Sequence, residues 1–158
     1  MTPIRIKISP LSWSDYSACR SMFEDLFDLD TLRYFWTDWK ARSEKYSYIA
    51  RYMDAVVGFA LVDTQNNIQY ICVHQDFQRQ GIGTLLLEKV LDSMSDERSI
   101  YLLTASDTRL AAWYGKYGFK VTKNYYDKGY AGSDMVLRQR CRSSILTCLP
   151  SSQNQEQA

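Results

Sequence analysis

The feature that most constrains the fold is one junction, the sequence YICVHQDFQRQGIGTLLLEKVL at residues 70–91. It starts as an apolar strand, crosses a polar loop to Gly-x-Gly, and continues as an amphipathic helix. Because glycine has no Cβ, a ligand can approach the backbone closely at this point. The first N–H groups of the helix have no partner within the helix, and the helix dipole adds positive charge. The junction therefore predicts an anion site, for which phosphate is the natural ligand.

Three phosphate-binding motifs compete for this junction. The P-loop requires GxxxxGK[ST], and the chain contains no Gly-Lys-Ser/Thr. The Rossmann fingerprint requires GxGxxG directly after the strand. Here Leu86 stands in the third glycine position, and a loop of several residues separates Val73 from Gly81. The third motif is Gln/Arg-x-x-Gly-x-Gly/Ala, which the sequence QRQGIG at residues 78–83 matches.

Composition narrows the class of protein. The chain has 158 residues, is 46% hydrophobic and carries a net charge of +1, which indicates one globular domain. That charge gives no electrostatic case for nucleic acid or a membrane as partner. The sequence has neither a membrane-spanning run nor the apolar core of a signal peptide. Its four cysteines form no CxxC pair and it has one histidine, so we expect no metal, and unpaired thiols predict the cytoplasm.

The hydrophobic periodicity predicts the element order β-α-α-β-β-β-α-β-α-β-β. This order indicates an α/β (α+β) fold, with helices on both faces of a mixed, mostly antiparallel sheet of about seven strands. We expect the domain to cover residues 1–140 and the polar tail, 141–158, to be mobile. The strands are expected at 4–8, 45–52, 55–64, 68–74, 99–105, 119–126 and 133–140, and the helices near 12–27, 31–40, 81–94 and 109–118.

At QRQGIG the chain resembles the GNAT superfamily of N-acetyltransferases. A second stretch, SDTRLAAWYGKYGF at residues 106–119, is similar to the family's Ser-Asn…Ala…(Phe/Leu)-Tyr-x-x-x-Gly-Phe pattern. Both motifs occur in the expected order on the expected elements. The resemblance covers about residues 1–140 and is strongest at 68–119. It implies the GNAT fold and an acetyl-CoA-dependent N-acetyltransferase, in which an amine attacks the thioester directly.

The resemblance also implies where acetyl-CoA would bind. Backbone groups of one strand would hold the pantetheine arm and the developing oxyanion, and the loop that follows would hold the pyrophosphate. Asp107 stands where the family often has an asparagine that contacts CoA, and a carboxylate there is less favourable. The strand residues are Ile71, Cys72 and Val73, and the loop residues are Gln78, Arg79, Gln80, Gly81, Ile82, Gly83 and Thr84.

Tyr114 matches the family tyrosine beside the coenzyme sulfur, whose implied role is to protonate the departing thiolate. Tyr117 is its rival, but the spacing to Gly-Phe selects Tyr114. No general base is evident, because Leu102 stands where some members have a catalytic glutamate. Water, through Tyr70 or His74, is the remaining route for the proton of the amine. A covalent intermediate on a cysteine of the strand is disfavoured, since buried cysteines usually act as small apolar residues.

The acceptor is predicted from FEDLFDLDTLRYFWTDW at residues 23–39, where carboxylates alternate with aromatic side chains. Such a surface suits an alkyl cation, so a small cationic amine such as a polyamine is the first candidate. The alternatives are a lysine side chain or N-terminus of a protein, a non-catalytic acyl-CoA-binding module, and aminoacyl-tRNA. A homodimer is compatible with the resemblance. The substrate-binding candidates are Glu24, Asp25, Asp28 and Trp36.

Overall fold

The computed structural model describes residues 5–105, 108–127 and 130–139. The chain forms two compact units that divide between Ser93 and Met94. The tail predicted at 141–158 and the predicted cofactor contact Asp107 lie outside the described residues. The predicted domain boundary at residue 140 therefore stays a prediction.

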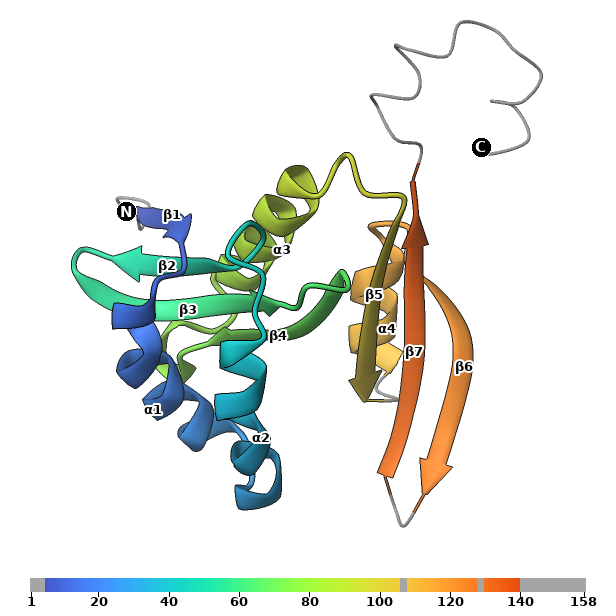
Figure 1. The fold of residues 1–158 in the computed structure, drawn as a ribbon, viewed down its shortest axis with the longest axis horizontal. Helices are drawn as coiled ribbons and strands as arrows, with labels where there is room; N and C mark the ends of the chain where they lie inside the picture. Colours follow the sequence, from blue (N-terminus) through green and yellow to red (C-terminus); the bar gives the residue numbers. More distant parts are fainter. Residues whose placement is uncertain (1–4, 106–107, 128–129, 140–158) are drawn as a thin grey trace, which may run out of the picture. The chain divides into compact units, whose positions relative to one another are not determined.

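The first unit contains an antiparallel meander, drawn from blue to green in Figure 1, in the strand order β1-β2-β3-β4. This pairing confirms the meander that the strand patterns predicted. Its elements are β1 (Ile6–Pro10), the 3₁₀ turn η1 (Trp13–Asp15), α1 (Tyr16–Leu26), α2 (Leu29–Lys40), β2 (Tyr48–Tyr52), β3 (Ala55–Val62), β4 (Asn67–Val73), the 3₁₀ turn η2 (Gln75–Phe77) and α3 (Ile82–Ser93).

Helices cover both faces of this meander, as Figure 1 shows, with α3 on one face and the α1–α2 pair on the other. Successive residues of β3 point to opposite faces because a strand has a side-chain period of two. Phe59 joins the buried cluster formed with α1 and α2. Gly58 faces α3, where a Cβ on it would lie 3.2 Å from Leu86 Cδ1 and 3.4 Å from Ile82 Cγ2.

Stacked aromatic rings fill the space between the helix pair and the sheet. The ring centroids of Phe23 and Phe35 lie 4.6 Å apart, and those of Phe35 and Phe59 lie 6.0 Å apart. Each such pair contributes about 0.5–1.5 kcal/mol beyond its buried area. Phe23, Phe35 and Trp39 are at most 1% exposed, so they belong to the core and not to the acceptor surface that their alternation with carboxylates suggested.

Helix α2 starts at Leu29, two residues earlier than the sequence predicted. Its N-cap is Asp28, whose carboxylate accepts a hydrogen bond from the backbone N–H of Thr31 at 2.8 Å. That backbone hydrogen bond, followed by one from the Thr31 side chain, lowers the pKa of Asp28 below its usual value. The N-cap aspartate therefore places the first turn of the helix before the predicted start at Thr31.

The second unit pairs β7 in antiparallel fashion with both β5 and β6, and α4 precedes β6 in the chain (Figure 1). Gly118, at φ 97°, follows α4, and the N–H of Phe119 bonds back to the carbonyl of Tyr114 at 3.4 Å. The elements are β5 (Ser99–Ala105), α4 (Thr108–Gly115), β6 (Lys120–Asp127) and β7 (Tyr130–Arg138).

The fold class predicted from the sequence, α/β with seven mostly antiparallel strands, is confirmed. Element bounds differ by a few residues: β1 continues to Pro10 because it pairs with β2 as far as Tyr48, and α4 ends at Gly115. Cys19 and Cys72 are buried free thiols. Among the described residues, no helix has both the length and the apolar character needed to cross a bilayer.

Replacing Gly58 with alanine tests the close packing of α3. The added Cβ would lie 2.9 Å from the backbone oxygen of Cys72, which cannot yield as a flexible side chain would. We expect the free energy of unfolding to fall by about 1–3 kcal/mol, the usual cost of overpacking. The measurement is urea unfolding followed by circular dichroism.

The matched control is Gly115→Ala in α4, where an added Cβ would have no heavy atom within 4 Å. This variant is expected to be neutral or slightly more stable, since alanine restricts the unfolded chain. Equal stability of Gly58→Ala and the wild type would contradict the close packing of β4 and α3 around Gly58.

Candidate functional site

The loop between β4 and α3 is tied to the end of its own strand. The side-chain N–H of Gln78 donates to the carbonyl of Val73 at 3.1 Å. The backbone N–H of His74 donates to Val57 on β3 at 2.8 Å, and the Phe77 ring lies 5.7 Å from that of Tyr52. These contacts hold the polar loop against the meander rather than leaving it free in solvent.

Two residues of this loop have a left-handed backbone, Arg79 at φ 64° and Gly81 at φ 83°. The first intrahelical bond of α3 runs from the N–H of Leu85 to the carbonyl of Gly81, at 3.0 Å. The N–H groups of residues 82–84 precede that bond and have no acceptor within the helix. A Cβ on Gly81 would meet no heavy atom within 4 Å, so the space above the glycine is open.

This arrangement is suited to an anion. The helix N-terminus supplies backbone N–H groups and a positive dipole, and the exposed Arg79 adds a full charge beside them. The predicted pyrophosphate residues, Gln78 through Thr84, lie together in this one loop and first helical turn. Among these residues, only position 81 favours glycine because of its backbone conformation, since a φ of 83° is costly for a residue with a Cβ.

The strand candidates occupy the last three positions of β4, paired with β3 through Ile71–Ala60, Cys72–Phe59 and Val73–Gly58. Burial raises the pKa of the Cys72 thiol to about 12, so the thiol is protonated near neutral pH. A thiol held in that form is a poor nucleophile, which agrees with the expectation that it acts as a small apolar residue.

Two of the four predicted acceptor residues come together at the turn between α1 and α2. Glu24 and Asp28 line a hollow of about 830 Å³, with Asp30 and the apolar side chains Phe27, Leu29 and Leu32. Asp25 and Trp36 are not among the residues that line it. Asp25 is exposed and its carbonyl accepts from the Gln75 side chain at 3.4 Å.

The carboxylates of the hollow already have local partners. Glu24 pairs with Arg20 at 3.1 Å and Asp30 pairs with Arg33 at 3.0 Å. Asp28 caps α2. Three carboxylates against two guanidinium groups leave a net charge of about −1 around the hollow.

The hollow lies near the second half of β4. The ring centroid of Phe27 on its wall is 6.0 Å from that of Tyr70, and Phe23 is 4.8 Å from the same ring. The Tyr70 hydroxyl donates to the carboxylate of Asp38 on α2. Burial and then this hydrogen bond raise the pKa of Tyr70 above its usual value. The sequence contains no signal for the pair, because its members are 32 residues apart and share no pattern.

His74, the other residue considered for proton transfer, is also engaged. Its Nδ1 accepts a hydrogen bond from the backbone N–H of Asp76 at 3.1 Å and so caps η2. The Nδ1 lone pair of His74 is therefore engaged by the backbone of its own turn. Within the described residues, no group of three or more His, Cys, Asp or Glu side chains is placed to hold a metal ion.

Tyr114 lies in the second unit, in the last turn of α4, and is 9% exposed. Its ring centroid is 4.9 Å from that of Trp113 and 5.8 Å from that of Phe119. Its carbonyl accepts from the N–H of Tyr117 at 3.0 Å. The tyrosine is thus held by packing on both sides in a helix that ends at Gly115, three residues before the Gly-Phe pair of the sequence motif.

Comparison with known proteins adds three findings. The family model described as acetyltransferase (GNAT) domain matches residues 26–139. A curated relative, the [ribosomal protein bS18]-alanine N-acetyltransferase of Salmonella typhimurium, is 28% identical over a 93-residue alignment that covers 53% of this chain. That match spans 63% of the relative's own length.

Two solved structures are similar in fold. Ard1 from Thermoplasma volcanium has a TM-score of 0.71 at 21% identity, over 85% of this chain and 97% of that one. Arabidopsis thaliana Naa50, in complex with the bisubstrate analogue CoA-Ac-MVNAL, has a TM-score of 0.70 at 21% identity, over 83% of this chain and 97% of that one. At such identities the similarity shows the fold alone.

The hydrogen bond from Tyr70 to Asp38 predicts a change of stability with pH. Because the folded state raises the pKa of Tyr70, its protonated form stabilises the fold below the usual tyrosine value of about 10, and this contribution is lost as the pH rises further. We expect Tyr70→Phe to lower stability by about 1 kcal/mol near pH 7, the low end for a half-buried bond to a charged group. The difference from wild type should shrink above pH about 10.

Urea unfolding at several pH values measures this difference, and Asp38→Asn should reproduce it. Tyr126→Phe is the control, since that side chain is 82% exposed and its loss should change stability little at any pH. A difference for Tyr70→Phe that stays constant up to the highest pH would contradict the pairing.

Proposed function

Since the chain belongs to the acetyltransferase (GNAT) domain family, we propose that it is an acetyl-CoA-dependent N-acetyltransferase. The observation that carries the proposal is the loop at residues 78–84, with its left-handed Arg79 and Gly81, open space above the glycine and helix N–H groups that have no acceptor within the helix. These residues fit a pyrophosphate in charge and in room. The analogue bound to Naa50 contains CoA, which supports the same co-substrate here.

In this proposal, acetyl-CoA supplies an acetyl group activated as a thioester. The backbone N–H groups at the start of α3 bind its pyrophosphate, and backbone groups of Ile71, Cys72 and Val73 hold the pantetheine arm. One N–H near Val73 stabilises the oxyanion as the amine attacks the carbonyl carbon. The Tyr114 hydroxyl gives its proton to the sulfur when the carbon–sulfur bond breaks, since phenol and thiol have similar basicity. The nitrogen loses one proton as the amide forms, and a proton returned through solvent restores the Tyr114 hydroxyl.

The amine loses its proton to solvent water. Tyr70 and His74, the two side chains considered for this step, already donate or accept hydrogen bonds with Asp38 and Asp76. The proposal therefore assigns no side-chain base. The bound ammonium group must lose its proton before the nitrogen can attack, and its pKa is about 10 for an alkylamine and about 8 for a protein N-terminus.

We place the acceptor amine at the hollow between α1 and α2, near β4. Its net charge of about −1 suits one ammonium group better than the several charges of a polyamine. A protein amine, above all an N-terminus, is therefore the first candidate. The names of the relatives support it: one is an alanine N-acetyltransferase for ribosomal protein bS18, and the analogue in Naa50 carries the peptide MVNAL.

A polyamine remains the second candidate. The observation in its favour is that Glu24, Asp28 and Asp30 converge on one hollow with apolar walls, which suits an alkyl chain between charges. A non-catalytic acyl-CoA-binding module is a third possible function, since no base is assigned.

Buried free thiols at Cys19 and Cys72 suit a reducing compartment, so the cytoplasm is the proposed location.

A CoA-release assay with acetyl-CoA and an amine panel tests the proposal. The panel contains a peptide with a free N-terminus, an N-terminally blocked peptide with one lysine, spermidine, spermine and putrescine. We expect release with the free N-terminus, and a fall in kcat of about 100-fold or more in Tyr114→Phe, because general acid catalysis contributes that much. Tyr117→Phe is the control and should keep most of the activity.

Release of CoA with polyamines alone would rule out a protein amine as the acceptor and would leave the proposed mechanism unchanged. Binding of acetyl-CoA without release on any amine would favour the binding module. An unchanged kcat in Tyr114→Phe would show that Tyr114 is not the general acid.

Gly81→Ala tests the anion site separately from the chemistry. A left-handed residue with a Cβ costs about 1–2 kcal/mol, so we expect acetyl-CoA to bind about 5–30-fold more weakly. Isothermal titration calorimetry with CoA measures this, and Gly115→Ala is again the matched control. Unchanged affinity would show that the loop does not hold the pyrophosphate.

A further inference from the structure

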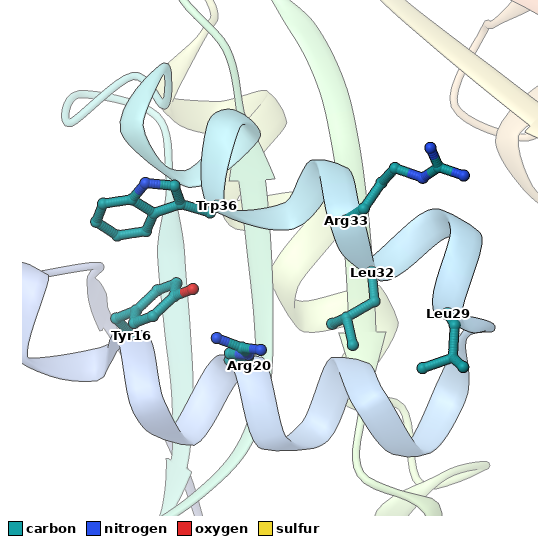
Figure 2. Close-up of a pocket in the computed structure, with 6 residues that line it drawn as sticks. All are labelled: Tyr16, Arg20, Leu29, Leu32, Arg33 and Trp36. Carbon is teal, nitrogen blue, oxygen red and sulfur yellow. The ribbon is translucent and has the colours of Figure 1, made fainter.

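A second hollow lies along the outer face of the α1–α2 pair, the face opposite the buried aromatic core. Figure 2 shows this groove, with side chains from both helices around it. Its volume of about 310 Å³ is at the lower end of the range for binding pockets, enough for a few side chains but not for a cofactor. The residues that line it are Tyr16, Arg20, Leu29, Leu32, Arg33 and Trp36.

Large apolar side chains are unusually exposed around this groove. Leu29 is 82% exposed and Trp36 is 46% exposed, although both lie in a helix whose other face is fully buried. Trp13, whose ring centroid lies 6.1 Å from that of Trp36, is 52% exposed as well. Adjoining exposed apolar side chains of this kind mark interaction sites in soluble proteins.

The groove also carries a small excess of positive charge, about +1 when Arg20, Arg33 and Lys40 are counted with the paired carboxylates Glu24 and Asp30. Arg20 and Arg33 are the only charged residues among those that line it, and Lys40 lies 5.2 Å from the Trp36 ring centroid. The two arginines pair with Glu24 and Asp30, but both pairs are largely solvent-exposed, at 50% and 45% for one and 63% and 86% for the other. Exposed pairs of this type are weak, so each guanidinium can take a better-placed carboxylate, in bidentate geometry.

We propose that this groove docks an acidic amphipathic helix of a partner protein. Its apolar side chains would pack between Tyr16, Leu32 and Trp36, and its carboxylates would pair with Arg20 and Arg33. A helix laid between two antiparallel helices is a common mode of peptide recognition, in which an apolar stripe provides affinity and flanking charges provide specificity. The proposal does not depend on the acetyl-CoA site or on the identity of the acceptor.

Other occupants fit the charges less well. A second copy packed groove to groove would place arginine against arginine, because a two-fold interface brings the same patch together. A membrane or nucleic acid presents a broad anionic surface. That surface would also meet the carboxylates of the neighbouring hollow, which shares Leu29 and Leu32 with the groove. A narrow acidic helix can lie on the cationic part alone.

The test uses two fluorescein-labelled helical peptides that share a leucine stripe. One carries glutamates beside the stripe and the other carries lysines at the same positions. Fluorescence anisotropy at physiological salt measures binding to the full chain, and tryptophan emission reports on Trp36. We expect the acidic peptide to bind at least about tenfold more tightly, with a blue shift in emission that Trp36→Phe reduces.

The double variant Arg20→Glu, Arg33→Glu should reverse the preference between the two peptides. The control Lys7→Glu, Lys89→Glu makes the same change in net charge at exposed positions on β1 and α3 and should keep the preference. Equal binding of both peptides, or an acidic preference that survives the arginine changes, would overturn the proposal. Binding to vesicles of anionic phospholipid in preference to the acidic peptide would overturn it as well.

Discussion

The close packing around Gly58, between β4 and α3, is the constraint on which the proposed acetyl-CoA site depends. With no Cβ on Gly58, Ile82 and Leu86 pack directly against β3, and the first turn of the helix lies at the end of the meander. Ile82, in the first turn of α3, therefore lies against the middle of β3, and the chain enters the helix through the left-handed Gly81. Packing thus holds together residues that are more than twenty positions apart in the chain.

Charge on the α1–α2 pair is divided between two surfaces. The carboxylates gather at the turn, where they line one hollow, and the arginines extend along the outer groove, although each arginine still contacts one of those carboxylates. A chain with a net charge of only +1 can therefore present an acidic site and a cationic site side by side. Overall charge excluded a general attraction to polyanions, but it carried no information about this local division.

Local sequence was informative where a single element carries the signal. The strand–loop–helix junction, the glycines and the Tyr-x-x-x-Gly-Phe spacing are all found where the periodicity placed them. The acceptor surface was less predictable, because Phe23, Phe35 and Trp39 alternate with carboxylates and yet face the core. A helix has one buried and one exposed face, and hydrophobic pattern alone does not say which aromatic side chains remain at the boundary.

The sequence by itself determined the element order, the fold class, the family and the strand–loop–helix junction at residues 70–91. Each follows from short-range patterns, since glycine conformations, helix starts and strand periodicity act over a few residues. Only the tertiary structure decided that Gly58 admits α3, that Tyr70 bonds to Asp38, and which carboxylates share a hollow. Those relations join residues far apart in the chain, and packing fixes them only once the sheet and its helices have assembled.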